Sequence, residues 1–353
     1  MSFAFRFSLL ACLASLLLAM TAAAATLPPY RIGVLYWSMN IPGQVAMRKG
    51  LEQEAAQINR VADRQGARGI ELITRVAGDG PEGIERQIVQ MRELIDLKPD
   101  VLVVQPTDNA ALAAPLRRAN QLGIPVVAYD QYISGGKLAA YVTSDNHQAG
   151  YLAGEYLASR FLGKRPMRLI LVEYPLVSST VERVNGLLDA LRDLDRAYVV
   201  LKTYQAVEPV AGAQAGAAIL RDFPQKGSVD AVFTVNDGGG LAVVDALARA
   251  GRKEILVASV DGDPGSVANI RKQRLTGIDS AQFCGPLGAE ALKAAYAIAQ
   301  GRPQASEIKV PVFPVTRETL RRYPGWMGPV PGDFTKPWPS RQPVWSGRPL
   351  IRH

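Results

Sequence analysis

Short β-rich runs alternate with longer helical patterns through most of this 353-residue chain, and this alternation limits the possible folds more than any other feature. Val101–Val104 is a continuous apolar run, which is typical of a strand buried on both faces of a parallel sheet. In Pro81–Leu97, by contrast, Ile84, Ile88 and Met91 fall on one face of a helix. Strands separated by helices of about 10–15 residues indicate parallel βαβ units. The sequence therefore predicts an α/β protein.

The alternation runs through the chain twice, with a restart near Ser144. The predicted strands are Arg31–Trp37, Gly69–Val76, Val101–Val104, Pro125–Tyr129, Ala139–Thr143, Met167–Tyr174, Tyr198–Tyr204, Asp230–Val235, Glu254–Val260 and Leu275–Ala281. The predicted helices are Pro42–Ala62, Pro81–Leu97, Asp108–Leu122, Gln148–Phe161, Thr180–Leu194, Ala211–Phe223, Gly239–Ala250 and Leu287–Gln300. So many strands exceed one small open sheet, and the restart favours two similar doubly wound lobes. A (β/α)₈ barrel is the alternative, and it accounts less well for the restart.

The first 25 residues have the pattern of a secretory signal peptide. One charge, Arg6, precedes the apolar stretch Leu9–Met20, and the small residues Ala22–Ala25 follow it. We expect cleavage near Ala25 and export to the periplasm. A lipoprotein cleavage at Cys12 is the alternative, but it would leave almost no apolar core.

Cleavage near Ala25 leaves Cys284 as the single cysteine of the mature chain, so no internal disulfide is expected. It is either a reactive thiol or a buried small hydrophobic side chain, and the second interpretation is favoured.

Composition excludes several classes of function. The 40 basic residues exceed the 32 acidic ones by eight, but they are scattered, so we expect no nucleic-acid partner. The only histidines are His147 and His353, and no histidine–cysteine cluster has the spacing of a metal site. Gly78–Gly83 matches G-x-G-x-x-G but follows the second strand, and Asp100 begins a strand where a dinucleotide site needs an acid at a strand end. We predict no catalytic residue, metal or cofactor.

The last thirty residues or so differ in composition from the rest. The prolines are Pro324, Pro329, Pro331, Pro337, Pro339, Pro343 and Pro349, and the tryptophans are Trp326, Trp338 and Trp345. Prolines at this density exclude helix and sheet, while the tryptophans argue against disorder. Residues 323–353 are therefore expected to form an extended arm that packs on a lobe.

Polar residues recur just past the predicted strands in both series. They are Asn40, Gln105, Asp130, Gln131, Asn236, Asp237, Asp261 and Gln282. In open α/β sheets ligands bind outside the carboxyl ends of the strands. Each residue alone is explained better as a helix cap or turn residue, but their recurrence at equivalent positions in the two series predicts a polar cleft between the lobes.

Over roughly Tyr30–Arg317 the chain resembles the type I periplasmic binding proteins of the ribose-binding family. The matching motifs are Asn40-Ile41-Pro42, Gln105-Pro106-Thr107-Asp108, Ile124–Asp130, Thr143-Ser144-Asp145-Asn146, Asn236-Asp237, Val260-Asp261-Gly262 and Ala281-Gln282. The resemblance implies a non-enzymatic binding protein with two doubly wound lobes joined by a three-crossover hinge. It places residues 26–143 and 283–310 in one lobe and residues 144–282 and 311–322 in the other. The ligand-facing positions it implies are Gln105, Asp130, Asn236, Asp261 and Gln282.

The chain departs from the sugar-binding members of this family at several positions. Gln131 and Val181 stand where those proteins usually carry arginine, and Gly43 and Gln44 replace an aromatic pair. Bidentate hydrogen bonds from arginine and stacked aromatic rings supply much of the binding energy for a sugar, so the departures argue against a ribose-like site. Other rings are candidates for the cleft or for packing, namely Trp37, Tyr132, Tyr174 and Phe283.

Two functions follow from the resemblance. The protein either delivers a small polar ligand, sugar-like or another small metabolite, to the membrane permease of an ABC importer, or it presents its liganded or empty state to a sensor histidine kinase. We expect a monomer when free. An enzyme built on this scaffold is a third and weaker interpretation.

Overall fold

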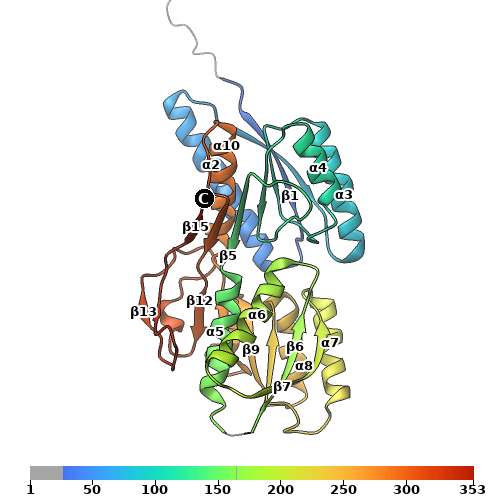
Figure 1. The fold of residues 1–353 in the computed structure, drawn as a ribbon, viewed down its shortest axis with the longest axis vertical. Coiled ribbons are helices and arrows are strands. Elements are labelled where there is room, and N and C mark those ends of the chain that lie inside the picture. The colour runs from blue at the N-terminus through green and yellow to red at the C-terminus, as the bar shows by residue number, and fades with distance from the viewer. Residues whose placement is uncertain (1–26, 164) are drawn as a thin grey trace, which may run out of the picture.

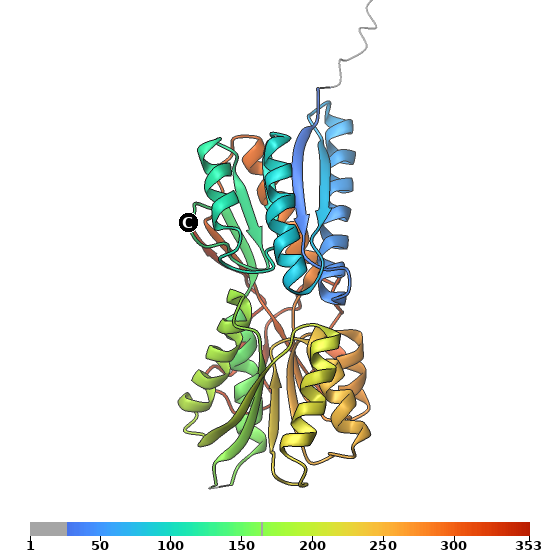
Figure 2. The same cartoon turned by 90° about the vertical axis from the view of Figure 1, so that its right-hand side faces the viewer.

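The structure is a computed structural model that describes residues 27–163 and 165–353. The predicted signal peptide lies outside the described residues. Figures 1 and 2 show two lobes stacked along the long axis, each a twisted sheet with helices on both faces. This arrangement confirms the α/β class with two mainly parallel sheets. The barrel is excluded because the strands form separate open sheets.

The first lobe is built mainly from the N-terminal series. Its elements are β1 (Tyr30–Tyr36), α2 (Pro42–Gln65), β2 (Ile70–Val76), α3 (Gly80–Asp96), β3 (Val101–Val104), α4 (Ala113–Gln121), β4 (Val126–Tyr129), β5 (Ala140–Ser144), α10 (Cys284–Ala299), β11 (Glu307–Val310) and β15 (Leu350–Arg352). The sheet order is β15-β11-β5-β4-β3-β1-β2, and only β15 runs antiparallel to its neighbour. Every residue of β3 and β4 is buried, as their continuous apolar runs predict.

The second lobe repeats this plan. Its elements are α5 (Asn146–Arg160), β6 (Met167–Glu173), α6 (Ser178–Asp193), β7 (Tyr198–Gln205), α7 (Pro209–Asp222), β8 (Ala231–Thr234), α8 (Asp237–Arg249), β9 (Leu256–Asp261), α9 (Pro264–Arg271), β10 (Thr276–Ala281) and β12 (Phe313–Thr316). The sheet order is β12-β10-β9-β8-β6-β7, with β12 antiparallel to β10. The sequence did not predict α9, whose eight residues are too few to show a helical period.

The chain passes between the two sheets at three adjacent places. It leaves the first sheet after β5, returns through Gln282 and Phe283 to α10, and crosses again between β11 and β12. The carboxyl ends of the strands in both lobes therefore meet at the junction, which is where ligands bind in open α/β sheets.

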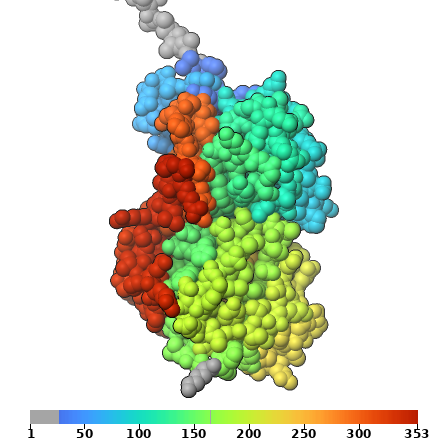
Figure 3. Space-filling model, in the orientation of Figure 1, coloured from blue at the N-terminus to red at the C-terminus, as the bar shows by residue number. Residues whose placement is uncertain are grey.

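The C-terminal arm, residues 323–353, forms short strands, so the prediction that its prolines exclude sheet is wrong. The hairpin β13 (Phe334–Thr335) with β14 (Val344–Trp345), and β15, occupy its proline-free stretches. Figure 3 shows the arm lying along one flank of both lobes. It packs on the second lobe through β13 and β14 and joins the sheet of the first through β15, which adds a fourth passage between the lobes.

The glycine motif Gly78–Gly83 is a turn followed by a helix start. Gly78 and Gly80 have positive φ values of 93° and 66°, and α3 begins at Gly80. A Cβ atom on Gly83 would lie 2.1 Å from the carbonyl oxygen of Gly78, so this glycine permits close packing within the turn. The motif thus has a local structural cause.

Among the described residues, the structure contains no helix with both the length and the apolar character needed to cross a bilayer. Cys284 is a free thiol, fully buried at the start of α10. Burial raises the pKa of this thiol well above its ordinary value, which keeps it protonated and unreactive.

Candidate functional site

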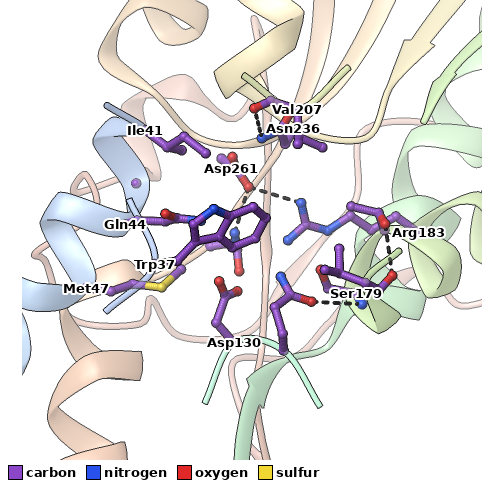
Figure 4. A pocket seen from close by; sticks show the side chains of 15 residues that line it. Trp37, Ile41, Gln44, Met47, Asp130, Ser179, Arg183, Val207, Asn236 and Asp261 are labelled. Carbon is purple, nitrogen blue, oxygen red and sulfur yellow. Dashed lines mark hydrogen bonds and ion pairs between the residues drawn. The ribbon is translucent and has the colours of Figure 1, made fainter. Parts of the chain in front are cut away.

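A cavity lies at the junction of the lobes, at the carboxyl ends of the strands (Figure 4). Its lining comes from both lobes and consists of Trp37, Ile41, Gly43, Gln44, Met47, Asp130, Gln131, Val177, Ser179, Thr180, Arg183, Val207, Asn236, Asp261 and Gln282. In this closed arrangement its volume is only about 30 Å³. Pockets that hold small molecules are typically about 300 Å³ or larger, so the lobes must separate to admit a ligand.

Asp130 follows β4 and enters the cavity through a strained turn. Its φ is 63°, in the left-handed region, and the N–H of Gln131 donates to the carbonyl of Tyr129 at 2.7 Å across it. Such a three-residue turn is rare for a residue with a side chain, and it aims the carboxylate away from the sheet. Burial raises the pKa of Asp130, while the amide of Gln105, the charge of Arg183 and the amide of Gln131 oppose this increase.

Gln105 lies directly beneath Asp130 and does not line the cavity. Its Nε2 donates to Asp130 Oδ2 at 2.9 Å, and its Oε1 accepts from the N–H of Trp37 at 3.3 Å. Gln105 is fully buried and therefore positions two residues that do line the cavity. Its direct contact with a ligand, implied by the resemblance, stays a prediction.

Asp261 reaches the cavity from the second lobe at the end of β9. Its Oδ1 accepts from Gln282 Nε2 at 2.6 Å and lies 3.2 Å from Arg183 Nη1. Its φ of 128° is also positive, so both cleft aspartates depend on unusual backbone geometry. Burial raises the pKa of Asp261 to about 7 although Arg183 opposes the shift. The nearby carboxyl groups of Asp237 and Asp130 add to this increase.

Arg183 is the main functional candidate that the sequence analysis missed. Its guanidinium donates to Asn146 Oδ1 at 2.9 Å and to the carbonyl of Val235 at 2.7 Å, besides pairing with Asp261. It projects from α6, which packs closely on α5: a Cβ on Gly150 would lie 1.8 Å from the Arg183 carbonyl oxygen. A charged residue inside an amphipathic helix gives no sequence signal of burial, so only the packing of α6 identifies it.

Most of the predicted site residues meet in this cavity. Six of them line it, namely Trp37, Asp130, Gln131, Asn236, Asp261 and Gln282. Asn236 caps α8, because its Oδ1 accepts from Gly239 N while its amide donates to the carbonyl of Val207. Gln282 is held at both ends, by Asp261 and by the hydroxyl of Ser144 at 2.7 Å.

Besides Gln105, two more predicted residues lie outside the cavity lining, Asn40 and Tyr132. Asn40 is exposed, and its amide donates to Asp79 Oδ2 at 2.7 Å. Tyr132 is 39% exposed and packs edge-on against Tyr141, while its N–H donates to the hydroxyl of Ser178. Tyr132 therefore contacts the second lobe, whereas Asn40 is bonded within the first.

Hydrogen bonds across the cleft hold the lobes together around the cavity. Asn109 makes two hydrogen bonds of 3.0 Å to the second lobe. Its N–H donates to the carbonyl of Leu176, and its Oδ1 accepts from the N–H of Ser178. Ser179 N donates to Gln131 Oε1 at 3.2 Å. On the other side, Glu208 Oε1 accepts from Gly80 N at 3.0 Å, which places a carboxylate at the N-terminus of α3. These contacts define a closed form.

The cavity offers binding groups but no recognisable reaction machinery. In the described part of the chain no three His, Cys, Asp or Glu side chains are grouped as a metal ion would require. His147 lies on the surface of α5 and pairs with Asp189 at 2.9 Å, and it is not among the cavity-lining residues. Carboxylates, amides, a guanidinium and an indole that surround a closed space can hydrogen-bond a polyhydroxylated solute from all sides.

Comparison with known proteins agrees with this geometry. The family model described as "Periplasmic binding protein domain" matches residues 32–303, so the C-terminal arm lies beyond the matched range. The ribose import binding protein of Bacillus subtilis (strain 168) is 29% identical over 283 residues, which cover 80% of this chain and 86% of that protein.

Solved structures have the same fold. An ABC transporter periplasmic solute-binding protein from Actinobacillus succinogenes 130z, with bound D-allose, has a TM-score of 0.70 at 25% identity, covering 83% of this chain and 100% of that one. The fructose-binding periplasmic domain of a hybrid two-component system has a TM-score of 0.71 at 23% identity, covering 83% and 92%.

Proposed function

Because the chain belongs to the periplasmic binding protein domain family, we propose that it captures a small polyhydroxylated solute between its lobes and delivers it to the membrane permease of an ABC importer. One observation carries this proposal: polar side chains from both lobes line the same cavity at the hinge. A ligand that bonds to both lobes stabilises the closed form over the open one. The closed form is then what the permease recognises.

The family match confirms two expectations from the sequence. The chain is a solute-binding protein of the sugar and polyol type, and it is a binding protein rather than an enzyme. The names of its relatives supply the first ligands to test, since one is a ribose import binding protein and another, from Mycolicibacterium smegmatis, is a xylitol-binding protein.

A thermal-shift screen with ribose, D-allose, xylitol and myo-inositol tests solute capture, followed by small-angle scattering with each compound that stabilises the protein. A ligand at 100 times its Kd adds about 2.7 kcal/mol to the free energy of unfolding. We expect the radius of gyration to fall when such a ligand binds. An unchanged radius at saturation, starting from an open protein, would falsify capture by lobe closure.

The variant Gln131→Ala tests the position of the site. It removes an amide from the cavity wall, and loss of one neutral hydrogen bond weakens binding about threefold to tenfold. Gln53→Ala, an exposed glutamine of α2 in the same lobe, is the control and should bind like the wild type. Equal affinities for both variants would place the ligand elsewhere.

Presentation of the bound state to a sensor histidine kinase is the second candidate. The structural likeness to a periplasmic domain of a two-component system supports this second candidate. Co-purification with detergent-solubilised permease or kinase, with and without ligand, separates the two. Ligand-dependent stimulation of the importer's ATPase supports delivery, and ligand-dependent kinase autophosphorylation without that stimulation supports sensing.

Export to the periplasm as a monomer completes the proposal. The Leu9–Met20 stretch and Ala22–Ala25 provide a signal peptide and its cleavage site. N-terminal sequencing of protein released by osmotic shock should begin close to Thr26, and light scattering should give the mass of one mature chain. An uncleaved N-terminus or a lipid-modified Cys12 would contradict this route.

A further inference from the structure

The charges around the cavity do not balance. Three charged side chains line it, Asp130, Asp261 and Arg183. The single guanidinium is already committed, because it pairs with Asp261 at 3.2 Å and donates to the carbonyl of Val235. Among the described residues, no ion pair includes Asp130. The lining therefore has an excess negative charge on the side of the first lobe.

Asp130 also has an oxygen that is free to bind. Its Oδ2 accepts from Gln105, whereas no hydrogen bond to its Oδ1 is present among the described residues. The residue is only 4% exposed, and Figure 4 shows its carboxylate pointing into the cavity. Burial disfavours this carboxylate and raises its pKa, and the charge of Arg183, which is paired with Asp261, opposes the increase only in part. A ligand that supplies a positive charge here would relieve this cost.

An ammonium group complements this carboxylate better than a hydroxyl does. A hydroxyl donates one hydrogen bond and leaves the charge in place, whereas an ammonium donates up to three and neutralises it. The indole of Trp37 lines the same cavity, and an aromatic face attracts cations. The hydroxyl of Ser179 is buried without a partner in the described structure and can accept a further bond.

The remaining polar groups suit hydroxyl oxygens. The side-chain carbonyls of Gln44 and Gln131 are held by the N–H groups of Ser38 and Ser179, at 3.0 Å and 3.2 Å. The amide nitrogen of Gln44 is therefore left as a donor at the cavity wall, whereas the amide of Gln131 acts on Asp130. The site thus combines hydrogen-bond donors for the hydroxyl groups of a ligand with one acceptor, the carboxylate of Asp130, that a cation would neutralise.

We propose that the captured solute is an amino sugar or amino polyol, a small polyhydroxylated compound with one protonated amine, and that the amine binds at Asp130. This inference rests on the proposed function, since it assigns a ligand class to the same cavity. It differs from that function in a testable way, because solute capture alone makes no demand on charge.

Matched compounds test the inference by isothermal titration calorimetry at neutral pH. The pairs are 2-amino-2-deoxy-D-glucose with D-glucose, 2-amino-2-deoxy-D-galactose with D-galactose, and 1-amino-1-deoxy-D-glucitol with D-glucitol. N-acetylated forms of the two amino sugars keep the nitrogen and remove the charge. In at least one pair we expect the amine to bind tenfold or more tightly than the hydroxyl compound, with the acetylated form losing this advantage.

The variant Asp130→Asn locates the amine. It keeps the shape and the bond to Gln105 and removes the charge, so the tenfold preference should disappear. Glu85→Gln, an exposed residue of α3, removes one charge from the same lobe and should keep the preference. Circular dichroism and melting curves of both variants show whether each is folded.

The outcomes separate this inference from solute capture. If a neutral compound binds as tightly as its amine partner, or only neutral compounds bind, the ligand class is wrong and the proposed function stands. If no amine in the panel binds, the ligand class is likewise overturned. If the amine preference survives in Asp130→Asn, the assignment of the amine to this carboxylate is overturned.

Discussion

The lobes meet each other at the cleft, and the C-terminal arm meets the second lobe, through different kinds of contact. Around the cavity they meet through single hydrogen bonds such as Asn109 to Ser178 and Gln131 to Ser179, between groups that water can replace. Along the arm, Trp338 packs edge-on against Tyr156, and Lys336 forms an ion pair of 2.6 Å with Glu155, which is fully buried. The hydrogen bonds across the cleft can break and re-form at little cost in free energy, because water replaces them. The buried contacts of the arm cannot be replaced by water without a large cost in free energy.

This difference divides the roles of the two sides. Trp345 is 2% exposed, packs against Phe313 and Phe334, and donates from Nε1 to the carbonyl of Val312 at 2.7 Å. The arm is thus built into the core of the second lobe, and the cleft is the side where movement is permitted. Experiments that weaken one side or the other should affect different properties, namely stability for the arm and lobe orientation for the cleft.

The largest effect is expected from Lys336→Ala. It leaves Glu155 buried without its cation, and breaking a buried pair from one side costs about 3–5 kcal/mol. Urea unfolding should show this loss, with ligand affinity little changed once the variant is folded. The control is Lys293→Ala, whose partner Glu290 is on the surface, where a pair contributes about 1 kcal/mol or less. Equal losses in the two variants would contradict a structural role for the arm.

A smaller effect is expected from pH, and it arises in the cleft. Burial raises the pKa of Asp261 to about 7, above its value in the unfolded chain, although Arg183 opposes this increase. Burial also raises the pKa values of three neighbouring carboxyl groups, those of Asp130, Asp237 and Asp279. The folded state therefore binds more protons than the unfolded state between about pH 4 and 7, and stability falls as pH rises through this range.

The slope is at most about 1.4 kcal/mol per pH unit for each such carboxyl. Chemical unfolding of ligand-free protein at pH 5, 6 and 7 measures it. Asp222 and Asp230 have pKa values lowered by their basic partners, so below about pH 4 they act in the opposite direction. Asp261→Asn should flatten the curve between pH 5 and 7. Stability that rises across this range in the wild type would refute the raised pKa values.

The smallest effect on stability is expected from Asn109→Ala. It removes the side-chain bond to Ser178 N and leaves the backbone bond to Leu176, so the loss should be about 1 kcal/mol or less. Small-angle scattering of ligand-free protein should nevertheless show a larger radius of gyration. Asn120→Ala is the matched control, because this asparagine bonds only within its lobe, to Lys137. An equal change in radius for both variants would mean that Asn109 does not hold the cleft closed.

The sequence predicted most of the sheet strands, because buried parallel strands are apolar throughout, as in Val101–Val104. It failed for the arm strands, which are two or three residues long and depend on partners such as β11 rather than on propensity. Five of the six predicted cavity residues follow from their position after strands, whereas Trp37 was predicted only as a candidate ring. Asn40 also follows a strand, but its side chain bonds to Asp79 in the neighbouring loop instead of lining the cavity. Arg183 could not be found, because burial of a helical arginine depends on tertiary packing.

The last passage of the arm between the lobes is short, and its length limits how far the protein can open. Trp345 is fixed in the second lobe, and Leu350 begins the strand that joins the sheet of the first. Five fully extended steps of chain reach about 18 Å, so this flank cannot separate beyond that distance without detaching a strand. The open protein therefore samples a narrower range of orientations than three crossovers alone would permit. Less orientational entropy is then lost on closure, and more of the contact energy of the ligand remains as affinity.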